Sequence, residues 1–280
     1  MEFERFSLSM RERVEELRRT AGHEASSHAF SSLYLWSEEK GYTVCFARDA
    51  FVVKGEGFYF FPCGKREDVS LLLQALWREE KTLSFRYARE ADLALAKAVF
   101  GEKLTVDFDE TAREYLFDRT EQIAMSGKKF TYQRAKCNKA RRLGEIVSIP
   151  LTAANADIAK DITERWASGR PTRGDADVTL RALDCIAALG LFGNLLYLDK
   201  EPIGFDLGAM IAPHILDIHI AKTLRDDVDT LMKLLWYETL PETVTVINRE
   251  EDLGIRGLRM HKSDAQPSGY NDTYTLTVTA

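Results

Sequence analysis

The chain has 280 residues, of which 45% are hydrophobic and 29% charged, and its formal net charge is −6 at pH 7. These values describe an ordinary globular protein with room for one large domain or two of usual size. No apolar run approaches the roughly 18 residues that a membrane helix needs. The N-terminal stretch has the pattern of an amphipathic helix and not of a signal peptide. We therefore expect a cytoplasmic protein without a transmembrane segment.

The first half of the chain alternates helical and strand-like patterns. Gly55 and Gly57 separate two of the strands, and a basic segment that we expect to be helical ends this half. The expected order is a helix at 8–20, three strands within 42–64, a helix at 66–79, a strand at 82–88, a helix at 89–99 and a strand at 103–110.

The second half repeats this order, with Thr152 as a helix N-cap and Gly190 as a helix C-cap. The expected order is helices at 152–169 and 177–190, a hairpin within 193–211 that turns at Asp199 and Lys200, a strand at 214–222, a helix at 226–237, a strand, an acidic loop and a helix within 244–262, and a strand at 273–279. The order predicts antiparallel-rich mixed sheets and not a doubly wound fold. Two similar halves indicate a tandem repeat, with domains at 1–145 and 146–280.

Residues 125–142 contain seven lysines and arginines and no carboxylate. On a helix, Phe130 and Cys137 fall on one narrow face and the cations spread around the other side. Such a helix can dock through its apolar face and offer cations to a phosphate backbone. The alternative is a solvated helix face, although such faces usually mix both signs of charge. The candidate phosphate-binding or tRNA-binding residues are Lys128, Lys129, Arg134, Lys136, Asn138, Lys139 and Arg141.

Residues 247–262 form a second unusual stretch, in which a strand, an acidic loop and a basic helix follow one another. Acidic residues before a helix and basic residues along it are what the helix dipole favours, so a structural role explains the pattern well. The functional alternative places Asn248 at a strand end, where its amide could donate a hydrogen bond to a reacting carbonyl.

Other motifs are missing, and their absence narrows the chemistry. The chain has no GxxxxGK[ST], no GxGxxG after a strand and no GxSxG, so nucleotide hydrolysis, dinucleotide redox chemistry and serine-hydrolase chemistry have no support. The four cysteines form no CxxC pair, and the five histidines form no HxH or HxxxH pattern. We expect no metal site, no bound cofactor and no disulfide framework. A histidine general base is not evident in the sequence either.

The segments "SGKKFTYQRAKCNK" (126–139) and "NREEDLGIRGLRMHK" (248–262) resemble paired signatures of the phosphatidylglycerol lysyltransferase C-terminal-domain-like family, and "SHAFSSLYLW" (27–36) resembles its entry segment. The resemblance implies two tandem GNAT-like (acyl-CoA N-acyltransferase) domains in the α/β (α+β) class. The family, like the similar peptidoglycan aminoacyltransferases, moves an amino acid from aminoacyl-tRNA to an acceptor. The matching residues are Lys128, Lys129, Arg134, Asn138 and Lys139 in the first motif, and Asn248, Arg249, Glu250, Asp252, Gly254, Gly257, Leu258, Arg259 and Lys262 in the second.

The chain also departs from the family pattern at several positions. Thr131 stands where a histidine is usual, and Tyr132 and Gln133 replace lysines. Ala221 replaces a glutamate, and Ala265 replaces a tyrosine before Pro267. These departures leave open the acceptor and whether the protein turns over substrate.

The resemblance implies a site with modest machinery, because an aminoacyl ester is already activated. Asn248 is the candidate for stabilising the oxyanion, and Glu250 and Asp252 are the other catalytic candidates. Arg249, Arg259 and Lys262 are the candidates for holding an anionic group of the substrate. The expected donor is aminoacyl-tRNA, and the acceptor a small molecule or peptide with an amine or hydroxyl.

Two alternatives belong to other functional classes. One is an acyl-CoA-dependent N-acyltransferase, which usually has a glycine-containing pyrophosphate loop after its fourth strand. Residues 221–235 contain no glycine and three aspartates, Asp226, Asp227 and Asp229, which disfavours a pyrophosphate. The other alternative is a non-catalytic RNA-binding or ligand-binding protein on a degenerate transferase fold.

Overall fold

A computed structural model describes residues 1–279, and the chain divides into two compact units. Unit 1 comprises Met1–Glu114, Glu251–Ile255 and Tyr270–Ala280, and unit 2 comprises Tyr115–Glu250 and Arg256–Gly269. The expected boundary at 145/146 differs from this division. Residues after Glu114 already contribute a strand and two helices to unit 2, and the last strand returns to unit 1.

The sheet of unit 1 follows the strand order β1-β2-β3-β4-β6-β15-β7, with β5 paired to β3. The C-terminal strand β15 is antiparallel to both β6 and β7. The strands are β1 (Glu4–Arg5), β2 (Thr43–Ala47), β3 (Ala50–Gly55), β4 (Phe58–Phe60), β5 (Cys63–Gly64), β6 (Thr82–Ala88), β7 (Leu104–Phe108) and β15 (Tyr274–Thr279). Within residues 1–279, β4 and β6 pair in parallel, whereas the other strand pairs of this sheet are antiparallel.

The helices of unit 1 bury their apolar faces against this sheet. Leu73 and Leu76 from α3 pack with Phe85, Leu276 and Val278 from β6 and β15 in one core. The helices are α1 (Arg11–Thr20), α2 (Phe30–Lys40), α3 (Arg66–Glu79) and α4 (Glu90–Phe100), with short 3-10 turns at Leu8–Met10, Ser26–His28, Gly101–Lys103 and Glu110–Ala112.

Two histidines in unit 1 are buried as a pair, with the ring centroids of His23 and His28 4.1 Å apart. Burial lowers the pKa of both rings, that of His28 to about 4, and the nearby guanidinium of Arg89 lowers both further. His28 is held by the carbonyl oxygen of Phe61 at 2.8 Å, whereas neither ring nitrogen of His23 has a hydrogen-bond partner within residues 1–279. Both rings are therefore neutral in the folded protein at neutral pH.

Because these two histidines are buried as neutral rings, we expect the folded protein to lose stability in acid. Because the folded-state pKa values lie below the ordinary 6.5, the unfolded chain takes up protons first, and stability falls as the pH drops from about 6.5 towards 4. His23→Phe removes one of these groups without removing a hydrogen bond, and should flatten the fall. Urea unfolding across this pH range is the measurement. A variant as acid-sensitive as the wild type would assign the effect to other groups.

The sheet of unit 2 follows the order β14-β8-β13-β12-β11-β10-β9. From β8 to β9 along this order, neighbouring strands are antiparallel except β12 and β13, which run parallel and place Asp217 opposite Asn248. The strands are β8 (Glu114–Asp118), β9 (Ile146–Leu151), β10 (Phe192–Leu198), β11 (Glu201–Ala212), β12 (Ile215–Thr223), β13 (Val246–Asn248) and β14 (Gly269–Asn271).

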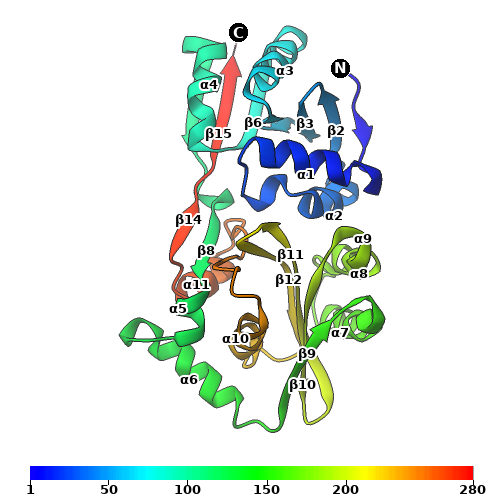
Figure 1. The fold of residues 1–280 in the computed structure, drawn as a ribbon, viewed down its shortest axis with the longest axis vertical. Helices are drawn as coiled ribbons and strands as arrows, with labels where there is room; N and C mark the ends of the chain where they lie inside the picture. The colour runs from blue at the N-terminus through cyan, green and yellow to red at the C-terminus, as the bar shows by residue number, and fades with distance from the viewer. Residues whose placement is uncertain (280) are drawn as a thin grey trace. The chain divides into compact units, whose positions relative to one another are not determined.

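Helices cover both faces of the unit 2 sheet, with α10 on one face and α7 and α8 on the other (Figure 1). Under α10, Trp236 and Tyr237 pack on Phe117, Leu216 and Ile247. The helices are α5 (Arg119–Ala124), α6 (Thr131–Ala140), α7 (Ala156–Ser168), α8 (Ala176–Asp184), α9 (Ile186–Leu189), α10 (Asp229–Thr239) and α11 (Arg256–Asp264), with 3-10 turns at Lys128–Phe130 and Ala153–Asn155.

The basic segment is not the single continuous helix that we expected. Met125 and Gly127 have left-handed φ values of 44° and 79°, so the chain turns before the 3-10 turn and α6. Arg134 fastens this turn by donating hydrogen bonds to the carbonyl oxygens of Met125 and Gly127. The expected apolar face is present, because Phe130 and Cys137 are buried in one core with residues of α10.

The fold class predicted from the sequence is confirmed: the protein is a mixed α/β chain with two mostly antiparallel sheets in tandem GNAT-like domains. Within residues 1–279, the structure contains no helix that combines the length and the apolar character needed to span a bilayer.

Candidate active site

The parallel strands β12 and β13 diverge soon after Asp217 and Asn248, because β13 ends at Asn248 while β12 continues to Thr223. A β-bulge lies on β12 at this point. Ile218 is opposite Gly208 and Ile220 is opposite Leu207, so His219 is an extra residue without a counterpart on β11. Bulges redirect a side chain and bend the strand. Openings at the carboxyl ends of parallel strands are common places for ligands in α/β proteins.

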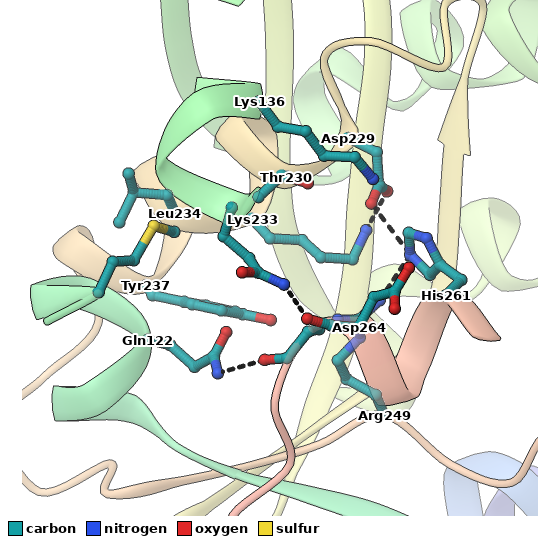
Figure 2. Close-up of a pocket in the computed structure, with 13 residues that line it drawn as sticks. Gln122, Lys136, Asp229, Thr230, Lys233, Leu234, Tyr237, Arg249, His261 and Asp264 are labelled. Carbon is teal, nitrogen blue, oxygen red and sulfur yellow. Dashed lines mark hydrogen bonds and ion pairs between the residues drawn. The ribbon is translucent and has the colours of Figure 1, made fainter. Parts of the chain in front are cut away.

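A pocket lies in unit 2 beside this opening (Figure 2). Its walls come from α5, α6, α10, α11 and the end of β13. The lining residues are Gln122, Met125, Gln133, Lys136, Asp229, Thr230, Lys233, Leu234, Tyr237, Arg249, His261, Asp264 and Ala265. Two backbone anchors hold the wall together, because Gln122 donates to the carbonyl oxygen of Ala265 at 2.8 Å and Gln133 donates to that of Asp264.

The base of the pocket holds a buried chain of charges. Lys233 pairs closely with Asp229 one turn earlier on α10, and its ammonium lies 3.4 Å from Asp206 on β11. Burial raises the pKa of the fully buried Asp206 to about 6, while the Lys233 ammonium opposes that rise. In contrast, Lys233 and His261 hold the pKa of Asp229 well below its usual range, against the effect of burial. Lys233 is therefore shared by two carboxylates of different basicity.

Arg249 and His261 form the inner wall. The guanidinium Nη2 of Arg249 lies 2.9 Å from Nε2 of His261, and the same ring nitrogen lies 3.2 Å from Oδ2 of Asp229. When Nε2 carries no proton, it can accept a hydrogen bond from Arg249. When Nε2 is protonated, it can donate a hydrogen bond to Asp229. Arg249 also stacks over Phe117 with 5.1 Å to the ring centroid, which fixes its direction.

The two motifs singled out in the sequence meet in this pocket. Gln133 and Lys136 come from the basic segment, and Arg249 and His261 come from the second motif. Lys136 also lies over the ring of Tyr132, 4.6 Å from its centroid. The two motifs are more than 100 residues apart in the sequence, so the fold and not local sequence makes this site.

The remaining cations of the basic segment lie in different surroundings. Lys128, Asn138, Lys139 and Arg141 are exposed. Lys129 is exposed as well but pairs with Glu121 at 2.7 Å, so an acidic partner exists outside the segment. Arg134 is half-buried and occupied with the carbonyl groups of its own turn. Lys128 and Lys139 are thus better placed for phosphate contacts than Arg134 or Lys129.

The predicted catalytic residues have different surroundings. Asn248 is fully buried, and its Oδ1 accepts a hydrogen bond of 2.8 Å from the backbone N–H of Glu250. Glu250 has a left-handed φ of 57°, and its Oε1 lies 2.9 Å from Nδ1 of His219. Asp252 belongs to unit 1, where it is fully buried and accepts from the N–H of Gly254. The catalytic roles of all three stay predictions.

The predicted anion-binding residues also differ from one another. Lys262 is buried, and its ammonium donates to the carbonyl oxygens of Arg249 (2.5 Å) and Glu250 (3.1 Å). Lys262 therefore has a structural role, because it holds the backbone that follows β13. Arg259 is half-buried on α11. Arg249 is the one of the three that lines the pocket.

Five charged or histidine side chains at or near the pocket were not among the candidate residues: Asp206, Asp217, His219, Lys233 and His261. Hydrophobic patterns gave no signal for Asp206 or Lys233, because each is flanked by buried hydrophobic residues in its strand or helix. His219 is the residue that most changes the expected chemistry, since a histidine does lie beside Glu250.

Comparison with known proteins agrees with the fold described above, a chain of tandem GNAT-like domains. A protein of unknown function from Bacteroides thetaiotaomicron matches with a TM-score of 0.86 at 23% identity, over 99% of both chains. FemX matches with a TM-score of 0.62 at 10% identity, over 98% of this chain and 97% of its own. L-PGS from Bacillus licheniformis matches with a TM-score of 0.60 at 16% identity, over 89% of this chain and 91% of its own.

The family model of the phosphatidylglycerol lysyltransferase C-terminal domain matches residues 18–277. The chain therefore belongs to this family, as the two sequence motifs indicated. A search of the curated proteins found no match.

Proposed function

We propose that this protein transfers an amino acid from aminoacyl-tRNA to an amine or hydroxyl acceptor. The observation that carries the proposal is the convergence of the basic segment and the second motif on one pocket. A donor held by its phosphates along α6 has its aminoacyl end within reach of Arg249 and His261. Membership of a transferase family supports the same reaction class.

The pocket has the groups that aminoacyl transfer needs. An ester carbonyl that becomes a tetrahedral oxyanion is stabilised by a positioned cation, and Arg249 is the cation of the inner wall. Asp229 offers a carboxylate to the ammonium of an aminoacyl group. His261, which lies beside Arg249 and Asp229, is the residue that would take a proton from the acceptor in this proposal. Asn248 would act indirectly in this arrangement, by holding the Glu250 turn.

Acyl-CoA is a poor fit as the donor. The loop before α10 holds an ion pair between Arg225 and Asp227 at 3.0 Å, and Asp229 begins the helix. These carboxylates oppose a pyrophosphate at the helix N-terminus, where an anion would otherwise be favoured. Calorimetry with acetyl-CoA should therefore show no binding in the micromolar range. Micromolar binding would instead support the acyl-CoA-dependent reaction.

Binding of tRNA tests the proposed donor. Lys128→Glu combined with Lys139→Glu reverses two exposed charges of the basic segment. Each lost phosphate contact should lower the salt dependence of binding by about 0.7 in log K per log salt if the bound strand behaves as single-stranded. We expect weaker binding and a slope smaller by about 1.4 for the double variant. The measurement is a filter-binding or fluorescence titration of total tRNA at several salt concentrations.

A matched control is available in unit 1. Lys81→Glu combined with Lys97→Glu makes the same change of net charge at exposed positions outside the basic segment. This control should keep the slope of the wild type. If both double variants bind tRNA equally well, or if the wild type does not bind it, the basic segment is a solvated surface and the donor is another molecule.

A further inference from the structure

The side chains of Asp217, His219 and Glu250 converge at the opening between β12 and β13. Asp217 and His219 come from β12, and the bulge at His219 follows Asp217, the last residue of β12 that pairs with β13. Glu250 comes from the segment after β13, where its left-handed backbone turns the chain. The three side chains are 0%, 4% and 22% exposed, so the cluster is largely removed from water.

The distances within this cluster are those of ligands around one ion. Nδ1 of His219 lies 2.9 Å from Oε1 of Glu250 and 3.3 Å from Oδ2 of Asp217, and all three ligand atoms lie within 4.8 Å of one another. Metal–ligand bonds of about 2.0–2.2 Å separate neighbouring ligand atoms by roughly 3.0–3.5 Å in octahedral or tetrahedral geometry. The side chains would need little movement to accept an ion.

Charge favours a cation at the same point. Two carboxylates in a largely dry site carry a charge of about −2 when both are ionised, and buried charges in proteins are paired or coordinate a metal. A divalent cation would compensate both carboxylates, with the imidazole remaining neutral as a metal ligand must be.

Hydrogen bonding to His219 accounts less well for the arrangement. A ring nitrogen carries one N–H, which points at one acceptor with good geometry. Here two carboxylate oxygens approach the same nitrogen, one from β12 and one from the segment after β13. If His219 only passed a proton to a carboxylate, one carboxylate beside its ring nitrogen would be enough.

We propose that Asp217, His219 and Glu250 bind one divalent first-row transition-metal ion, of the class of Zn²⁺ or Mn²⁺. One imidazole with two carboxylates is a mixed nitrogen and oxygen set, which suits these ions better than Mg²⁺ or Ca²⁺. Three protein ligands leave at least one coordination position for water or for an oxygen of a bound molecule. The site is separate from the pocket lined by Arg249 and His261, and the proposal does not depend on the transfer reaction.

Metal binding by the purified full chain tests the proposal. After treatment with a chelator, titration with Zn²⁺ or Mn²⁺ should show one site, with an affinity of about micromolar or better, and a raised melting temperature. Mg²⁺ at the same concentration should give a smaller effect. Asp217→Asn and Glu250→Gln should each weaken binding by more than about tenfold.

His261→Gln is the matched control. His261 also lies next to a carboxylate, that of Asp229, but it does not belong to the cluster of Asp217, His219 and Glu250. The variant should bind the ion as the wild type does. If Asp217→Asn does not fold, Glu250→Gln decides, since Glu250 is the most exposed of the three side chains. Absence of binding by the wild type, or binding that neither ligand variant weakens, overturns the proposal and leaves a hydrogen bond between His219 and Glu250 as the role of the cluster.

Discussion

Arg249→Ala should lower the rate of aminoacyl transfer by about 100-fold or more, as the loss of one oxyanion-stabilising donor does. Arg249 is the predicted anion-binding residue that lines the pocket, and its direction is set by His261 and Phe117. Arg249→Lys should recover little, because an ammonium lacks the planar fork of donors and the stacking surface of a guanidinium. Binding of tRNA should change by less than about twofold, since few phosphate contacts are lost.

The rate can be measured as release of labelled amino acid from a mixture of charged tRNAs, with hydroxylamine as a surrogate amine acceptor. Arg256→Ala is the control, because Arg256 is an exposed arginine on α11 outside the pocket. A thermal melt of each variant separates loss of activity from loss of folding. An Arg249→Ala protein that is folded and keeps most of the wild-type rate would move the reaction away from this pocket.

Lys233→Met should destabilise the fold by roughly 3–5 kcal/mol, the usual cost of breaking a buried ion pair from one side. Lys233 is 6% exposed and serves both Asp206, which is fully buried, and Asp229. Without the ammonium, two carboxylates face each other across a site from which water is largely excluded. Asp206→Asn in the same chain should restore part of the lost stability by removing one of these charges.

The loss of stability caused by Lys233→Met should depend on pH in a definite direction. Burial has already raised the pKa of Asp206 to about 6, above its ordinary 3.8, so the neutral carboxyl is the form that the folded protein prefers. Stability from this group is therefore present at low pH and is lost as the pH rises through about 6. The cost of Lys233→Met should be larger above this pH than below it. Guanidinium unfolding at two pH values measures the difference, and an equal cost at both would show that Asp206 does not interact with Lys233.

Much of the fold could be predicted because its signals are local. Thr152 caps the turn that leads into α7, Gly190 ends α9 in a left-handed conformation, and Asp199 and Lys200 have the left-handed φ values of a tight hairpin. The division into units could not be predicted in this way. It depends on β15 pairing with strands far back in the chain, and such pairing has no local signature.

The candidate site was predicted in part for the same reason. Arg249 and Lys136 stood out because they belong to charged motifs. His219 did not, because its partner Glu250 is 31 residues away and the bulge that redirects it depends on the register of β11 against β12. Lys262 has a motif position but serves backbone carbonyl groups, and a side chain's task cannot be inferred from its type alone.

The place of β15 between β6 and β7 affects how the protein is made. A ribosome synthesises β7 long before β15, since Asp109 and Thr275, which are in contact, are 166 residues apart. During that interval β6 and β7 have unpaired edges, which are sites of aggregation in partly folded chains. Domains usually fold in the order of synthesis, but the sheet of unit 1 can be completed only after the polypeptide of unit 2 has been translated. We expect a nascent chain that stops before residue 274 to be recognised by chaperones as unfinished, even though the first 114 residues are already present.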